Sequence, residues 1–163
     1  DFLDIGTISL EKMLYITEDI HKQIKNYIIT SSDLYISIAG TIGKTGIIPD
    51  ILNGANLTEN AARLVYKGSN VLNRYIYFLT NSMKFKEQIG LATKTVAQPK
   101  LALSRLSEVE LPLPMLDIQH KVVSYLDSVS IQIEQVKSAQ QQKMQNLLDL
   151  KSSILDQAFH GKL

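Results

Sequence analysis

The sequence predicts an α+β protein, in which a region of mixed strands and helices is followed by one long coiled-coil-forming α-helix. Before Pro114, short apolar runs alternate with Gly, Asn and Pro, as strands and short helices joined by turns require. Residues 118–158 contain neither Gly nor Pro, and their apolar residues recur at steps of three and four. We therefore expect two domains, at residues 1–115 and 116–163.

Three strands are expected in the first region. Residues 33–39 form an apolar run that predicts a strand, and the glycine-rich residues 40–46 predict a turn. Residues 46–48 return as a second strand, which Pro49 ends. Residues 61–66 are a further strand candidate.

A helix is expected over residues 71–90, because apolar residues there follow helical spacing and Gly90 supplies a natural C-terminal stop. Residues 109–114 are expected to be extended, because each of their two prolines disfavours the α conformation of the residue before it. This extended segment separates the two regions.

The long helix carries an apolar seam with heptad spacing. The seam residues are Leu126, Val129, Ile133, Val136, Leu147, Leu150 and Ile154. Gln140 and Lys143 also occupy seam positions, where polar side chains cost stability but fix register or orientation. A helix about 60 Å long cannot be covered by one small domain. We therefore expect the seam to pack on a partner helix, and the alternative is a helix folded back along its own domain.

The composition is that of an ordinary globular protein, with 45% apolar and 20% charged residues. The absence of cysteine excludes a disulfide scaffold, a thiolate metal site and a cysteine nucleophile. No apolar run is long enough to span a membrane, and the N-terminus lacks the pattern of a signal peptide. We therefore expect a cytoplasmic protein without membrane association, cut from a longer chain.

The positive charge is concentrated in one part of the chain. The formal net charge is only +1, yet residues 67–105 hold seven lysines and arginines against the single acid Glu87. Such a run is often a solvated face, and the alternative is a surface that contacts phosphate.

Catalytic and metal-binding motifs are not apparent. The sequence around Lys44 ends like a phosphate-binding loop, but that motif needs a glycine where Ile38 stands and a helix afterwards. A tight hairpin with an exposed Lys44 is predicted instead. The histidines His21, His120 and His160 have no further ligand at metal spacing, so surface roles are expected and no metal or cofactor. An enzyme is the least favoured class, since no carboxylate pair or nucleophile motif is readable.

Three stretches of the chain resemble the specificity subunits of type I restriction–modification enzymes. They are SIAGTIGK at 37–44 with GANLTENAARL at 54–64; TVAQPKL at 95–101 running through LPLP at 111–114 to IQH at 118–120; and QQQK at 140–143 with LKSSILDQAF at 150–159. The order and spacing of these stretches carry the resemblance, which covers nearly the whole chain.

The resemblance implies a non-catalytic subunit that reads DNA for other subunits. In that family, a chain usually holds two target recognition domains, each followed by a long helix, and the two helices pack antiparallel. The present sequence matches one such unit. An N-terminally incomplete target recognition domain occupies residues 1–115, and a spacer and dimerisation helix occupies residues 116–163. The implied partners are double-stranded DNA, the DNA methyltransferase (modification) subunits and the restriction subunit.

A single helix also implies an antiparallel homodimer that reads a gapped palindrome. The candidate DNA contacts are Thr41, Lys44, Lys94, Thr95, Gln98 and Lys100. Gln98 lies in a segment that recurs in the family, so a structural role is its alternative. The alternative function for the whole chain is an assembly module that dimerises or binds modification subunits through its helix without reading DNA.

Overall fold

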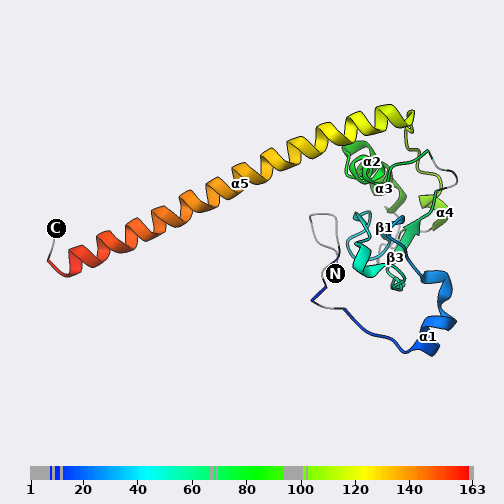
Figure 1. The fold of residues 1–163 in the computed structure, drawn as a ribbon, viewed down its shortest axis with the longest axis horizontal. Coiled ribbons are helices and arrows are strands. Elements are labelled where there is room, and N and C mark those ends of the chain that lie inside the picture. The colour runs from blue at the N-terminus through cyan, green and yellow to red at the C-terminus, as the bar shows by residue number, and fades with distance from the viewer. Residues whose placement is uncertain are drawn as a thin grey trace. The chain divides into compact units, whose positions relative to one another are not determined.

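The computed structural model describes residues 8, 10–11, 13–66, 68, 70–93, 101 and 103–161 and divides the chain into two compact units, residues 1–123 (unit 1) and 124–163 (unit 2). The elements are α1 (Glu18–Gln23), η1 (Lys25–Tyr27), β1 (Leu34–Ser37), β2 (Thr45–Ile47), η2 (Asp50–Leu52), β3 (Ala61–Leu64), α2 (Asn73–Thr80), α3 (Met83–Thr93), α4 (Leu103–Leu106) and α5 (Leu116–Phe159) (Figure 1). The predicted α+β class, with one long C-terminal helix, is confirmed.

The three strands form one antiparallel sheet in the order β2-β1-β3. Leu34 of the central strand pairs with Ile47 on one side and with Leu64 on the other. The strands expected at 33–39, 46–48 and 61–66 are therefore present, each shifted or shortened at its ends. All four residues of β1 are buried, as a central strand covered on both faces requires.

Side chains of β1 alternate between separate parts of the core. Ile36 packs with Phe85 and Ile89 of α3, whereas Tyr35 packs with Ile29, Ile48 and Leu52. Because successive strand residues point to opposite faces, one short strand anchors both clusters. Burying each of these side chains contributes about 1.5–3 kcal/mol of transfer free energy.

The prediction of a single helix over residues 71–90 is wrong in two respects. The chain forms two helices there, α2 and α3, with a break at Asn81 and Ser82. The Ser82 hydroxyl accepts a hydrogen bond from the Phe85 amide at 3.3 Å, so Ser82 caps α3 at its N-terminus. Gly90 lies inside α3 and does not end it. Apolar spacing continues across the break, because both helices contribute apolar residues to the core.

Gln119 fixes the first turn of α5 to unit 1. Its side chain is fully buried, at 0% exposure. The side-chain oxygen accepts from the Leu72 amide at 3.0 Å, and the side-chain nitrogen donates to the carbonyls of Asn70 at 2.9 Å and Pro114 at 2.7 Å. Leu72 is the residue before α2 and has no capping bond from its own side chain. Gln119 therefore provides hydrogen-bond partners for backbone groups at the start of α2 and at the end of the proline segment.

Apolar contacts complete the attachment of this part of the helix. Val122 and Val123 pack against the cluster of Leu34, Tyr75 and Ile76. The first two turns of α5 thus belong to unit 1, which ends at Val123. The division by packing falls after Val123, eight residues later than the predicted boundary at 115/116.

The remainder of α5 is a continuous helix, and every residue from 131 to 161 is exposed. Its polar residues bond along the helix, as where Lys137 contacts Glu134 at 2.7 Å. The seam residues in this part of the helix are solvent-accessible, with exposures from 47% at Ile154 to 57% at Val136, whereas Leu126 and Val129 nearer unit 1 are partly exposed. None of the helices in the described part of the chain is both long and apolar enough to cross a membrane.

Replacing Gln119 by methionine should destabilise unit 1 by about 2–4 kcal/mol, because buried backbone groups lose their partners while side-chain volume is kept. Urea unfolding followed by circular dichroism measures the loss. Gln135→Met is the matched control, since Gln135 is an exposed residue of the same helix. Equal unfolding midpoints for the two variants would contradict the role of Gln119.

Candidate nucleic-acid interface

The hairpin between β1 and β2 is closed by main-chain hydrogen bonds. The Gly43 amide donates to the Ser37 carbonyl, and the Ser37 amide donates to the Lys44 carbonyl, both at 2.8 Å. Gly40 and Gly43 have φ of 71° and 82°, a region that favours glycine. Strand β2 follows directly, so the segment lacks the helix of a phosphate-binding loop. The predicted tight hairpin is confirmed.

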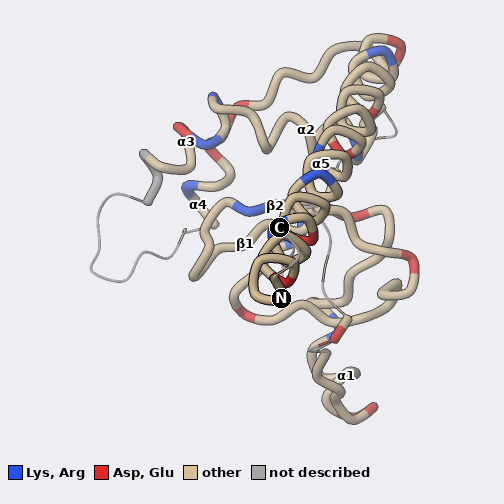
Figure 2. Tube along the Cα trace, turned by 90° about the vertical axis from the view of Figure 1, so that its left-hand side faces the viewer, with Lys and Arg blue, Asp and Glu red and all other residues tan. Residues whose placement is uncertain are grey.

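A groove of about 540 Å³ lies between this hairpin and helices α2 and α3. We call it the hairpin groove. Its lining residues are Thr41, Ile42, Gly43, Lys44, Thr45, Tyr77, Asn81, Phe85, Lys86, Ile89 and Gly90. This set contains two lysines and no acid, so the groove carries positive charge and suits an anionic ligand. Figure 2 marks basic residues beside β2 and on α3 in blue.

Buried contacts fix the two walls of the groove to each other. The hydroxyls of Thr45 in β2 and Thr80 in α2 lie 2.6 Å apart and are both buried, and Thr80 also donates to the Tyr77 carbonyl at 3.0 Å. A β-carbon at Gly43 would lie 2.8 Å from a methyl carbon of Ile89 in α3. The hairpin therefore rests directly on both helices, and the groove is preformed.

The polar side chains of the groove differ in exposure. Thr41, Asn81 and Lys86 are exposed, whereas Lys44 is only partly exposed. The expectation of an exposed Lys44 is corrected, because the hairpin packs against α3 and covers part of the side chain. The Asn81 side-chain nitrogen donates to the Tyr77 carbonyl at 2.8 Å, which orients the amide at the end of α2.

A further cation lies on α2 beside the groove. The Arg74 guanidinium carbon is 5.5 Å from the ring centroid of Tyr77 and 5.0 Å from that of Phe78. These are cation–π distances, so the two rings hold the guanidinium at the helix surface. Tyr77 itself lines the groove, so Arg74 adds to the positive charge next to it.

The structure brings together Thr41 and Lys44 of the predicted contacts and adds Asn81 and Lys86 to them. Lys86 belongs to the basic run that the sequence revealed. Asn81 gave no signal, because its position depends on the break between two helices that were predicted as one. The other predicted contacts lie outside the described residues; they are Lys94, Thr95, Gln98 and Lys100.

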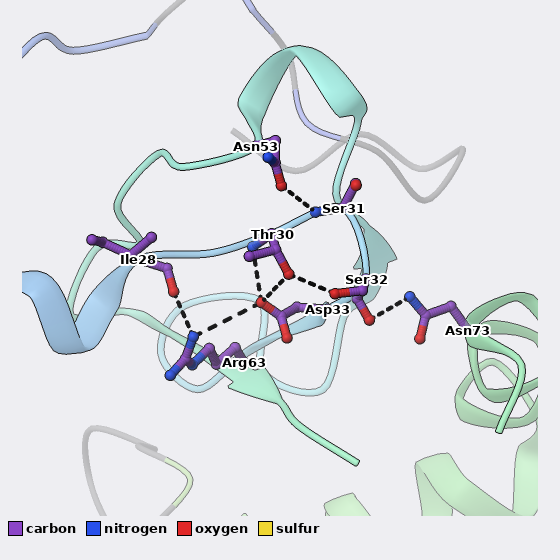
Figure 3. A network of polar contacts seen from close by, with 8 residues as sticks. All are labelled: Ile28, Thr30, Ser31, Ser32, Asp33, Asn53, Arg63 and Asn73. Atoms are coloured by element: carbon purple, nitrogen blue, oxygen red, sulfur yellow. Dashed lines mark hydrogen bonds and ion pairs between the residues drawn. The ribbon is translucent and has the colours of Figure 1, made fainter. Parts of the chain in front are cut away.

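The buried carboxylate of Asp33 has a structural role (Figure 3). It accepts hydrogen bonds from the amide of Thr30 at 2.8 Å and from its hydroxyl at 3.0 Å. The Arg63 guanidinium lies 3.9 Å away and donates to the Ile28 carbonyl at 2.7 Å. The Ser32 carbonyl accepts from the Asn73 side chain at 2.6 Å. This network holds the turn before β1 against β3 and α2.

The remaining ionisable groups do not assemble into a reactive site within the described residues. His21, expected at the surface, is partly buried and hydrogen-bonded to Asn56, so it joins α1 to the loop before β3. His120 and His160 are exposed, as expected. No three His, Cys, Asp or Glu side chains among these residues are placed to hold a metal.

Burial, with a smaller contribution from the Asp33 charge, raises the pKa of the Tyr66 hydroxyl beyond its usual range.

The chain matches a family model described as the type I restriction modification DNA specificity domain, over residues 2–145. It is 24% identical over 158 residues to the type I restriction enzyme EcoBI specificity subunit of Escherichia coli, covering 97% of this chain and 33% of the relative. It is also 24% identical to the MjaVIII specificity subunit of Methanocaldococcus jannaschii, covering 100% and 38%. The chain thus spans little more than a third of these relatives.

Two solved structures share the fold. One, from a study of complex assembly and conformational transition of the type I R-M system, matches with a TM-score of 0.68 at 24% identity and covers 83% of this chain and 32% of that chain. The other is the HsdS subunit from Thermoanaerobacter tengcongensis, with a TM-score of 0.59 at 17% identity over 67% of this chain and 28% of that chain.

Gly43→Ala should destabilise unit 1 by about 1–3 kcal/mol, because the new methyl group meets Ile89 and the backbone keeps a positive φ. Gly40→Ala is the matched control. Its φ is also positive but nothing lies within 4 Å, so it should cost only about 1 kcal/mol. Urea midpoints measure both variants. A Gly43 variant as stable as the Gly40 variant would show that the hairpin does not rest on α3.

Proposed function

The chain belongs to the type I restriction modification DNA specificity family, and from this membership we propose that it reads one half of a split DNA target. It would direct methylation and cleavage that other subunits carry out, and would have no catalytic centre of its own. The observation that carries the proposal is the hairpin groove, whose lining residues include the two lysines Lys44 and Lys86.

The groove offers the two kinds of contact that DNA reading needs. Lysines neutralise phosphates and position the protein, whereas hydroxyl and amide side chains can bond to base edges in the major groove. We assign phosphate contact to Lys44 and Lys86 and base contact to Thr41 and Asn81. The preformed walls support this assignment, since little conformational entropy would be lost on binding.

The predicted contacts at Lys94, Thr95, Gln98 and Lys100 are retained in this proposal. They continue the basic run that includes Lys86. The Leu101 amide donates to the Ile38 carbonyl at 2.8 Å, directly before the hairpin. This bond ties the chain after the predicted segment to the base of the hairpin.

We assign pairing and assembly to α5. In the proposal the target recognition domain occupies residues 1–115 and the helix 116–163. Two copies would pair antiparallel through the seam at Leu126, Val129, Ile133, Val136, Leu147, Leu150 and Ile154. Such a dimer would read a gapped inverted repeat in the cytoplasm and bind modification and restriction subunits. The length and exposure of the seam support this arrangement.

Replacing Lys86 or Lys44 by glutamine should weaken binding to a random duplex and lower the slope of log Kd against log salt by about 1 for each lysine. Fluorescence anisotropy across a potassium chloride series measures the slope. Lys137→Gln is the control with the same change of charge, because Lys137 lies on α5 and pairs with Glu134. A slope equal to that of the unmodified protein would exclude the altered lysine from the interface.

Selection of bound duplexes from a randomised pool at low salt should enrich a gapped inverted repeat. Enrichment of a lone half-site would support DNA reading and count against the dimer. If no sequence is enriched while the helix still binds modification subunits, the assembly function without DNA reading would replace the proposal.

A further inference from the structure

We infer that a second copy of this chain pairs with α5 in one register, set by facing Gln140–Lys143 pairs. The two-fold axis passes between Gln141 and Gln142, and Ile133 of one chain faces Leu150 of the partner subunit. The inference rests on the proposed antiparallel dimer and specifies it. The observations that carry it are the order of seam residues, the place of the two polar ones and the extent of the exposed helix.

The seam leaves unit 1 at a defined point. Its first positions, Gln119 and Val122, face unit 1 and are used there for hydrogen bonding and packing. The next positions, from Leu126 onward, contribute to none of the buried clusters formed by the described residues. A partner helix is needed to cover them.

Spacing restricts how two such seams can meet. Along the helix the steps between seam residues alternate between three and four. In an antiparallel pair, the seam residues of the two helices meet at every position only in certain registers. In these registers, a residue whose next seam neighbour lies three positions ahead faces a residue whose previous seam neighbour lies three positions behind. One such register pairs Leu126 with Gln157, Val129 with Ile154, Ile133 with Leu150, Val136 with Leu147 and Gln140 with Lys143. By symmetry each pair occurs twice.

The two polar seam residues select this register from its neighbours. Here the Gln140 side-chain oxygen can accept from the ammonium group of the partner subunit's Lys143. A shift by one heptad in one direction places Lys143 against Leu147 of the partner subunit, and a shift in the other places it against Ile133. Either shift opposes a charge to an apolar side chain in the seam, which is unfavourable. Parallel pairing in register would place Lys143 against Lys143, where like charges repel.

The length of the exposed helix gives the same register independently. Unit 1 ends at Val123 and α5 ends at Phe159. In the inferred register Ser124 faces Phe159 of the partner subunit, so the helix of unit 2 overlaps completely with its copy. A shift by one heptad either leaves two turns without a partner or brings Phe159 opposite residues that belong to unit 1.

Disulfide trapping tests the register without background, because the chain contains no cysteine. The full-length Ile133→Cys and Leu150→Cys proteins are mixed in a glutathione redox buffer, in which disulfides exchange until the best-fitting pair accumulates. Mass spectrometry then measures the relative amount of each disulfide-linked dimer. We expect the 133–150 disulfide to exceed either homodimeric disulfide by about tenfold.

The matched control replaces Leu150→Cys by Leu147→Cys, which displaces the thiol by about 4.5 Å along the helix. Dominance of the 133–147 species would overturn the register while leaving an antiparallel dimer in place. Dominance of the 133–133 species would indicate a parallel pair and overturn the inference. A monomer by light scattering with no cross-link would overturn the dimer itself, whereas DNA reading is decided by the separate anisotropy measurement.

A second measurement tests what sets the register. In a protein that also carries Gln140→Leu and Lys143→Leu, a shift by one heptad no longer places a polar side chain at position 140 or 143 against an apolar one. A disulfide between Ile133→Cys and Gln157→Cys, which needs such a shift, should then rise by about tenfold relative to its level with Gln140 and Lys143 present. No rise would overturn the assignment of register to these two residues.

Discussion

The enclosure of β1 is the constraint on which unit 1 depends. Because β1 is paired along both edges and covered on both faces, its few residues must satisfy two neighbouring strands and separate apolar clusters. Tyr35 and Ile36 are both at 0% exposure although they point to opposite sides. The hairpin after β1 and the helices packed on it are consequently held in one arrangement, and the hairpin groove inherits that rigidity.

A second fixed point is the junction where α5 starts. A fully buried glutamine is an expensive residue to place in a core unless every polar atom finds a partner. Gln119 meets that condition by bonding to the ends of two other segments, so helix, proline segment and α2 form one structural element. The same helical stripe then changes its role within two turns, from domain core to exposed seam.

The sequence predicted the elements that depend on local pattern, and missed features that depend on packing. Strand β1, the hairpin at Gly40 and Gly43 and the length of α5 followed from an apolar run, glycine positions and helical spacing. The break at Ser82 was missed because a serine cap is short and leaves apolar spacing intact on both sides. Asn81 was missed with it. The burial of Gln119 could not be predicted either, since its partners lie far away in sequence.

The groups that maintain the hairpin conformation differ from the side chains that the hairpin presents to the hairpin groove. Its closure relies on amide and carbonyl groups of Ser37, Gly43 and Lys44, and on the positive φ and close approach to Ile89 that Gly43 allows. The exposed hydroxyl of Thr41 takes no part in these closing hydrogen bonds. Position 41 can therefore change during evolution without loss of the fold, so a lineage could acquire a new binding preference there by single substitutions.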